Sequence, residues 1–276
     1  MPVAALAAVL VAALLHASWN LVVKSSSERL VAASAQVALA GVAFLPVLVW
    51  RGFPLEVLPF LVGSGFVQVG YLYALASAYD RADLSFVYPI ARGSAPVLIA
   101  LGGLLGFSAR VEGLGWLALG LICGGVMLLG LTASSPQGAG WSLLTGMLIA
   151  TYVTVDGAGV RRTEDVLAYT AALYGLTALL LVPLTLRVRG PAAVRQAVEA
   201  EWKRHLLAGV ASLGSYGLLL YASRLAPLSL VSAARETAVV FATAGGWWFL
   251  DEAVGRLRVT ATVVIAAGVA VLALTR

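Results

Sequence analysis

Long apolar stretches recur along the whole of this 276-residue sequence. A run of about 18 or more apolar residues can cross the hydrocarbon core of a bilayer as a helix. Charged residues make up 11% of the chain and hydrophobic residues 61%, whereas soluble domains contain about 25% charged residues. A membrane β-barrel would need alternating apolar and polar residues, and these stretches do not alternate. The sequence therefore predicts an all-α polytopic membrane protein.

Charges and turn residues divide the chain into about ten predicted spans. In the first half we expect them at 3–23, 30–50, 57–79, 85–107 and 113–131. In the second half we expect them at 141–156, 166–186, 205–223, 228–250 and 259–274. Between 187 and 204, Val194, Val198 and Trp202 lie four residues apart among charges, which predicts a short amphipathic helix at the membrane interface.

The two halves of the chain share a pattern. Residues 85–101 (SFVYPIARGSAPVLIAL) place Arg92 inside an apolar run, and residues 229–245 (SLVSAARETAVVFATAG) place Glu236 at the corresponding point, 144 residues later. The same offset superimposes Gln68 on Ser212, Tyr71 on Ser215 and Gly124 on Gly268. Five spans per half is an odd number, so the halves would have opposite orientations in the membrane. We therefore expect two inverted five-helix repeats, residues 1–131 and 141–276, with the binding site near the membrane midplane at their interface.

The two charges inside apolar runs are the first candidates for a functional site. Placing a charge at the centre of a bilayer costs about 2.5–3.5 kcal/mol, so such residues normally face a protein interior or an aqueous cavity. Arg92 and Glu236 have two interpretations. They could form a structural ion pair between the halves, or they could face a cavity where Arg92 binds a carboxylate and Glu236 an ammonium group or a proton.

Polar and aromatic residues at helical spacing extend this site. On the first span Asn20 lies four residues after His16, and on the ninth Ser232 and Glu236 share a face that directs the adjacent Arg235 elsewhere. We expect the substrate-binding residues to be Trp19, Asn20, Gln68, Tyr71, Tyr88, Arg92, Tyr152, Ser212, Tyr216, Ser232 and Glu236.

Several kinds of site are not indicated. Cys123 is the one cysteine, and the sequence has no HExxH motif, no Gly-rich phosphate loop and no His or carboxylate cluster at metal-ligand spacing. We therefore expect no catalytic residues, no metal and no cofactor. The net charge of +5 comes from short loops, which indicates contact with lipid rather than nucleic acid. The distribution of Lys and Arg between loops does not decide which side the termini occupy.

The chain resembles the EamA-type members of the drug/metabolite transporter superfamily over essentially its whole length. The resemblance lies in the opening helix, LLHASWNLVVK, in the fourth, SFVYPIARGSAPVL, and in the ending, FLDEAVGRLRVTATVVIAAGVAVLAL. Within that family the nearest functional type is a YddG-type exporter of amino acids. This resemblance implies a central cavity lined by the first, third, fourth, sixth, eighth and ninth helices, cytoplasmic termini, and a location in the bacterial inner membrane.

These features together predict a secondary transporter that exports small metabolites, aromatic and other amino acids foremost, by alternating access. Its partners would be the small-molecule substrate and the lipid bilayer, with Glu236 as a candidate for proton coupling. One alternative is a multidrug exporter of lipophilic cations, for which Glu236 would be essential and Arg92 dispensable. Another is a membrane protein that transports nothing, either an assembly partner or a lipid-modifying enzyme, with Arg92 and Glu236 sealed in a pair.

Overall fold

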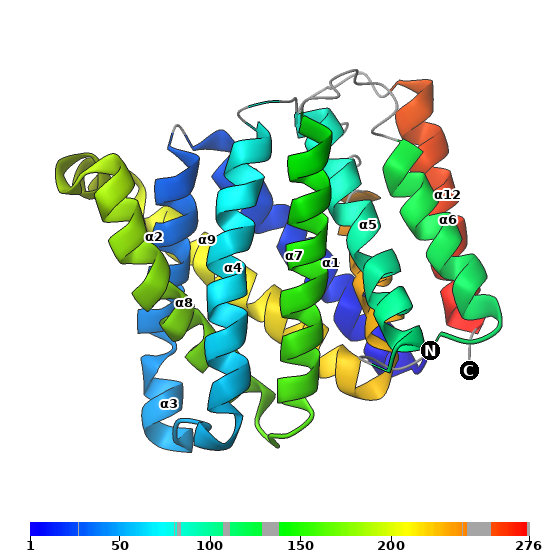
Figure 1. Cartoon of the computed structure of the whole chain (residues 1–276), viewed down its shortest axis with the longest axis horizontal. Coiled ribbons are helices and arrows are strands. Elements are labelled where there is room, and N and C mark those ends of the chain that lie inside the picture. The colour runs from blue at the N-terminus through cyan, green and yellow to red at the C-terminus, as the bar shows by residue number, and fades with distance from the viewer. Residues whose placement is uncertain are drawn as a thin grey trace.

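The computed structural model of the chain describes residues 1–26, 28–79, 81, 84–106, 111–128, 138–238, 240–241 and 255–274. The elements within these ranges are all helical (Figure 1). In chain order they are α1 (Val3–Ser25), α2 (Arg29–Ala43), α3 (Leu45–Arg51), the 3-10 helix η1 (Leu55–Val57), α4 (Leu58–Tyr79), α5 (Leu84–Leu104), α6 (Leu114–Leu128), α7 (Ala139–Val160), α8 (Val166–Arg189), α9 (Pro191–Leu225), α10 (Leu228–Arg235) and α12 (Arg256–Leu274).

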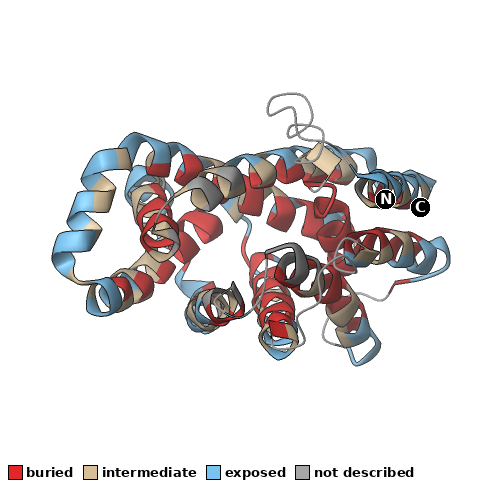
Figure 2. Ribbon diagram, turned by 90° about the horizontal axis from the view of Figure 1, so that it is seen from above, coloured by how far each residue is buried: buried red, intermediate tan, exposed pale blue. Residues whose placement is uncertain are grey.

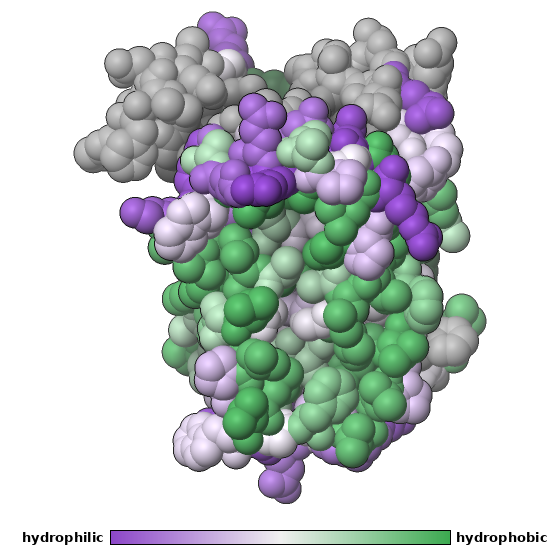
Figure 3. Space-filling model, turned by 90° about the vertical axis from the view of Figure 1, so that its left-hand side faces the viewer, coloured by the Kyte–Doolittle hydropathy of each residue, from purple (hydrophilic) through white to green (hydrophobic). Residues whose placement is uncertain are grey.

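Many of these helices have the length and composition of membrane spans. Six of the described segments qualify fully, namely Val3–Asn20, Leu30–Arg51, Leu55–Leu75, Ala139–Val160, Val166–Arg189 and Pro191–Leu225. Three shorter helices, Ile90–Leu104, Leu114–Leu128 and Val259–Leu274, are also apolar. The face in Figure 3 carries apolar side chains across its middle and hydrophilic ones at both ends, as a bilayer requires. The chain is thus an all-helical, multi-pass membrane protein.

Helix α9 (Pro191–Leu225) covers two predicted elements. The sequence predicts a short interfacial helix within 187–204, followed by a span at 205–223. The break between them is confirmed, because α9 consists of two helical parts that meet at a kink, a few residues before the predicted boundary. The helix bends where the backbone of Glu201 leaves helical geometry (φ −132°, ψ 21°). Gly190, at φ +80°, and Pro191 turn the chain sharply from α8 into α9, a combination typical of a helix end followed by a helix start.

Two other predicted spans differ in detail. The second, 30–50, is divided at Phe44 into α2 and α3, because Pro46 has no N–H to donate to the preceding turn. The ninth, 228–250, begins as α10 and continues into a turn at Glu236 and Thr237. Residues 242–250 of that prediction lie outside the described residues.

Helix α7 occupies a central position in the bundle (Figure 1). It packs against α4, α5 and α9, while α1 packs against α9, α2 against α8, and α6 against α12. Seen end on, the buried residues face the middle of the bundle (Figure 2). The approach of α7 to α5 is so close that a Cβ at Gly146 would overlap the hydroxyl oxygen of Ser94 and lie 2.9 Å from the carbonyl oxygen of Ala91. This contact holds the buried polar residues of α5 and α7 next to each other.

Candidate functional site

A cluster of charged side chains is buried where α1, α5 and the end of α10 meet. One guanidinium nitrogen of Arg92, Nη2, lies 2.6 Å from Nε2 of His16, and the other, Nη1, lies 3.8 Å from Oε1 of Glu236. Arg235 acts electrostatically on both His16 and Glu236. All four side chains are at least 94% buried. We refer to His16, Arg92, Arg235 and Glu236 as the charged cluster.

The position of Arg235 corrects the sequence prediction. Ideal helical spacing directs Arg235 away from Glu236, yet both side chains are buried. The reason is that α10 ends at Arg235, and the backbone N–H of Glu236 donates to the carbonyl of Ala233, three residues back. This tighter turn changes the angle between neighbouring side chains. The charged cluster therefore holds two arginines and one glutamate.

The charged cluster contains polar atoms that are not satisfied by hydrogen bonds. Oε2 of Glu236 and Nε of Arg235 are buried and have no hydrogen-bond partner within the described part of the chain. Leaving a buried polar atom unpaired costs about 1–3 kcal/mol, more when the group is charged. A ligand that supplies one acceptor and one donor would remove this cost.

A small polar pocket adjoins the charged cluster at Arg92. It is lined by Asn20, Tyr71, Leu75, Ala91, Arg92, Thr145 and Ile149. Its volume of about 20 Å³ is enough for about one water molecule. At this volume the pocket is too small to hold a metabolite.

A row of three tyrosines leads away from the pocket along α7. The ring of Tyr71, in the pocket wall, lies 5.6 Å from that of Tyr152 between centroids, and Tyr152 lies 6.1 Å from Tyr216. Because such separations are typical of packed aromatic pairs, the row is a continuous contact. It connects the pocket with a second buried polar group on α7, Asp156.

Asp156 is fully buried and surrounded by hydroxyl groups. Oδ1 accepts a hydrogen bond from Tyr169 at 2.8 Å, and Oδ2 accepts one from Tyr216 at 2.5 Å. Ser64 is a further hydrogen-bond partner of the carboxylate, and its hydroxyl oxygen accepts from the amide of Gln68 at 3.1 Å. We call Asp156, Tyr169, Tyr216 and Ser64 the Asp156 cage; its members come from α7, α8, α9 and α4.

The sequence prediction did not include Asp156 in the site. The sixth span was expected to end at about that residue. In the structure α7 continues to Val160, so Asp156 lies a full turn inside it. The signal that could have identified it is the four-residue spacing from Tyr152, which places both on one face.

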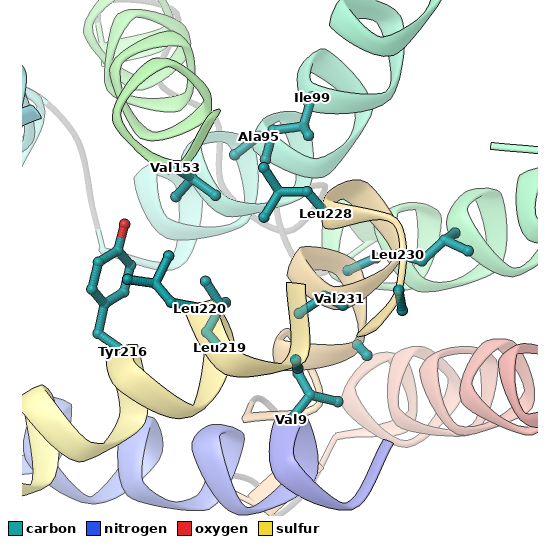
Figure 4. Packing of buried hydrophobic residues seen from close by; sticks show 14 of the residues in the cluster. Val9, Ala95, Ile99, Val153, Tyr216, Leu219, Leu220, Leu228, Leu230 and Val231 are labelled. Atoms are coloured by element: carbon teal, nitrogen blue, oxygen red, sulfur yellow. The ribbon is translucent and has the colours of Figure 1, made fainter. Parts of the chain in front are cut away.

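A cluster of buried apolar side chains lies next to Tyr216 of the Asp156 cage. Figure 4 shows Leu228 of α10 next to Ala95 and Ile99 of α5 and Val153 of α7, with Leu219 and Leu220 of α9 close by. A Cβ at Gly157 would lie 2.8 Å from Leu228. Leu228 and Gly157 also line a more open hollow of about 250 Å³, together with Gly106, Thr154, Ala158, Arg161 and Arg162.

The remaining predicted residues are distributed around these features. Ser212 and Tyr174 share a hydrogen bond of 2.7 Å between their hydroxyl groups, and the Trp19 ring lies 5.0 Å from that of His16. Ser232 is buried on α10. Tyr88 belongs to α5, and its side chain lies outside the described part of the structure.

The structure therefore brings some of the predicted site residues together and places others elsewhere. Arg92 and Glu236 come together, Asn20, Tyr71 and Arg92 share the pocket wall, and Tyr152 connects the pocket to the cage. Asn20 also donates to the backbone carbonyl of His16 at 2.8 Å. Tyr216, in contrast, belongs to the Asp156 cage, and Gln68 donates a hydrogen bond to Ser64 of that cage; neither lines the pocket.

Comparison with known proteins gives two findings. Residues 136–274 match the model of the EamA-like transporter family. The whole chain is similar to a solved chain described as "Crystal structure of protein", with a TM-score of 0.80 and 20% sequence identity over 98% of this chain and 97% of that one. At this identity the likeness establishes the fold alone. No curated protein matches the chain.

Proposed function

The chain belongs to the EamA-like transporter family, and from this we propose that it is a secondary transporter that exports small metabolites, amino acids foremost, by alternating access across the bacterial inner membrane. Members of the family are transporters rather than enzymes. A small-molecule substrate and a lipid bilayer follow as its partners. The proposal adds the substrate class, the mechanism, the location and the residues that bind the substrate.

Alternating access is supported by the way the helices pair. If α1, α2, α4, α5 and α6 correspond to α7, α8, α9, α10 and α12, the most extensive contacts between helices have counterparts, whereas the smaller contact of α8 with α9 has none of comparable size. The contact of α1 with α9 corresponds to that of α7 with α4, while the contacts of α2 with α8 and of α6 with α12 correspond to themselves. Such correspondence is expected for two inverted repeats, which can exchange conformations to open the site to either side.

The observation that carries the amino acid proposal is the composition of the charged cluster. Two buried arginines lie close to one buried glutamate whose Oε2 has no hydrogen-bond partner among the described residues. An amino acid is a zwitterion, so its carboxylate complements Arg92 and Arg235, while its ammonium group complements Glu236. Tyr71, Tyr152 and Trp19 lie near enough to contact an aromatic or aliphatic side chain.

The same composition disfavours the alternative of a lipophilic cation. A substrate with positive charge alone would satisfy Glu236 but would lie close to two arginines, and like charges repel strongly in a medium of low dielectric constant. The proposal therefore assigns roles to both Arg92 and Glu236. A multidrug exporter would need Glu236 only.

The decisive experiment is uptake of radiolabelled amino acids into proteoliposomes that contain the purified protein. We would compare the wild type with Arg92→Lys, which keeps the positive charge and loses the planar, bidentate guanidinium. Truncating a buried, hydrogen-bonded charge pair costs about 2–5 kcal/mol, so we expect at least a tenfold lower uptake rate at subsaturating substrate. Arg195→Lys is the matched control, because Arg195 is largely exposed.

Each outcome has a defined meaning. Saturable wild-type uptake that falls in Arg92→Lys and not in Arg195→Lys supports the proposal. Transport of a lipophilic cation, with no transport of amino acids, contradicts it. Uptake that is equal in all three proteins would show that Arg92 does not contact the substrate.

A further inference from the structure

If transport is coupled to protons, one buried carboxylate must bind the proton, and it need not be the one that binds the substrate. Resting on the proposed function, we propose that Asp156, and not Glu236, is the proton-binding site, and that its protonation is coupled to the movement of substrate. The step is a simple acid–base reaction, in which a proton from water forms an O–H bond with one oxygen of the carboxylate. No other reactant is required.

The two carboxylates differ in their partners. Glu236 lies 3.8 Å from a guanidinium nitrogen of Arg92 and also interacts with Arg235. These cations favour the ionised glutamate. Asp156 is equally buried, but the hydrogen-bond donors identified around it are the hydroxyl groups of Tyr169, Tyr216 and Ser64, all without formal charge. No ion pair of Asp156 occurs among the described residues.

The hydroxyl groups around Asp156 can form hydrogen bonds with either its ionised or its protonated carboxyl group. An ionised carboxylate accepts from all of them, whereas a protonated one needs an acceptor for its own O–H. Tyrosine and serine hydroxyls can donate or accept, so rotation of one O–H bond is enough to accommodate the proton. A guanidinium can only donate, so the charged cluster does not offer the same exchange at Arg92.

Among the described residues, the elements packed around Asp156 contribute no further charged group to the cage. From α8 the group that faces it is Tyr169, from α9 it is Tyr216, and from α4 it is Ser64, supported by Gln68. On α7 itself the nearest aromatic neighbour is Tyr152, and α10 contributes Leu228 against the next residue, Gly157.

Two contacts connect proton binding with the substrate site. The first is the row Tyr71, Tyr152 and Tyr216, which extends from the pocket wall to the cage. The second is Ser64, which belongs to the first half of the chain, while the other members of the cage belong to the second. Protonation of Asp156 therefore changes a hydrogen bond between α4 and α7, the pair that would separate when the halves move.

The test is pH-difference infrared spectroscopy of the full purified chain, without any substrate. The C=O stretching band of a protonated carboxylic acid should be present at mildly acidic pH and disappear at mildly alkaline pH. We expect this band in the wild type and in Glu236→Gln, and we expect Asp156→Asn to lack it. The asparagine side chain still accepts hydrogen bonds from Tyr169 and Tyr216, so the variant should fold; thermal unfolding checks this.

The proposal is overturned if the wild type has no such band, or if the band survives in Asp156→Asn and is lost in Glu236→Gln. Should Asp156→Asn fail to fold, Tyr169→Phe gives an independent test. This variant removes one donor to the ionised carboxylate, which favours the protonated form, so the band should persist to a more alkaline pH. An unchanged pH midpoint in Tyr169→Phe would contradict the assignment.

Transport measurements complete the test. With an imposed pH gradient, amino acid flux through the wild type should change severalfold, and flux through Asp156→Asn should be insensitive to the gradient. If the band titrates as expected but no amino acid is transported, the proton site stands and the proposed substrate class fails. If amino acids are transported with the same gradient dependence in both proteins, the coupling role of Asp156 is wrong.

Discussion

The charged cluster and the Asp156 cage are both buried, both contact α7 or its immediate neighbours, and differ in how completely their polar atoms are satisfied. Both carboxylate oxygens of Asp156 accept a hydrogen bond at 2.8 Å or less. In the charged cluster the closest approach of Arg92 to Glu236 is 3.8 Å, and Oε2 of Glu236 has no partner in the described structure. The cage is complete without a ligand, and the cluster is not.

This difference indicates different uses of buried polarity. A satisfied network gains little from binding a polar molecule, because its hydrogen bonds would first have to break. An incompletely satisfied cluster next to a polar pocket gains hydrogen bonds when a ligand enters. The proposals follow this distinction: the substrate binds at the charged cluster, and the smallest ligand, a proton, binds at the cage.

The largest expected effect disrupts both regions at once. In Gly146→Leu the new side chain would overlap Ser94 and the backbone of Ala91, so α5 and α7 cannot keep their contact. Overpacking typically costs about 1–3 kcal/mol, and occasionally more; this position should exceed that range, because the obstacle includes backbone. Gly120→Leu is the control, since nothing described lies within 4 Å of a Cβ there. Size-exclusion chromatography in detergent should show a folded peak for Gly120→Leu only.

The second prediction concerns the charged cluster alone. Glu236→Gln removes the carboxylate that lies close to Arg92 and Arg235, and breaking a buried pair in this way costs about 3–5 kcal/mol. Thermal unfolding in detergent should therefore shift to a markedly lower temperature. The double variant Arg92→Gln with Glu236→Gln should recover part of the loss, because it also removes one of the uncompensated charges. A Glu236→Gln variant as stable as the wild type would mean that these charges are not coupled.

A third prediction compares the Asp156 cage with a hydrogen bond between two neutral groups, through the same substitution at two positions of α8. Tyr169→Phe removes a hydrogen bond to a carboxylate, and Tyr174→Phe removes one to the hydroxyl of Ser212. Bonds to charged groups contribute about 1.5–3 kcal/mol and neutral ones about 0.5–1.5 kcal/mol. Chemical denaturation at alkaline pH should show the larger loss for Tyr169→Phe. Equal losses at every pH would show that Asp156 is never ionised in the folded protein.

The sequence was most informative about the apolar helices and the paired charges. Runs of apolar residues predict spans well because the bilayer imposes one length and one composition, and α4, predicted at 57–79, occupies Leu58–Tyr79. The contact of Arg92 with Glu236 was among the alternatives considered, because both interrupt such runs. Arg235 was misplaced because a helix end changes side-chain direction, and Asp156 was missed because its partners Tyr169 and Ser64 come from distant parts of the chain.

The smallest predicted effect concerns Asp165, a carboxylate outside the membrane. Unlike Asp156, it is partly exposed and pairs with an arginine. Asp165 caps α8 by accepting from the backbone N–H groups of Leu167 and Ala168, and it pairs with Arg51 at 2.8 Å. Partial burial alone would raise the pKa of Asp165, but the hydrogen bonds from Arg51 and from the two N–H groups hold it below its ordinary value.

The sign of the pH effect follows from that lowered pKa. The stabilisation is fully present above the unfolded-state pKa, about 3.9, and is lost as the pH falls through the lower pKa of the folded state. Asp165→Asn should therefore be less stable than the wild type at neutral pH, by about 1 kcal/mol or less for a partly exposed pair, and the difference should shrink in acid. Thermal unfolding of both proteins across that pH range measures it. A difference that stays constant with pH would mean that the cap stabilises α8 through hydrogen bonds alone. In that case the negative charge of Asp165 would contribute nothing to the stability of α8, and its hydrogen bonds would act like the uncharged hydrogen bonds elsewhere in the protein.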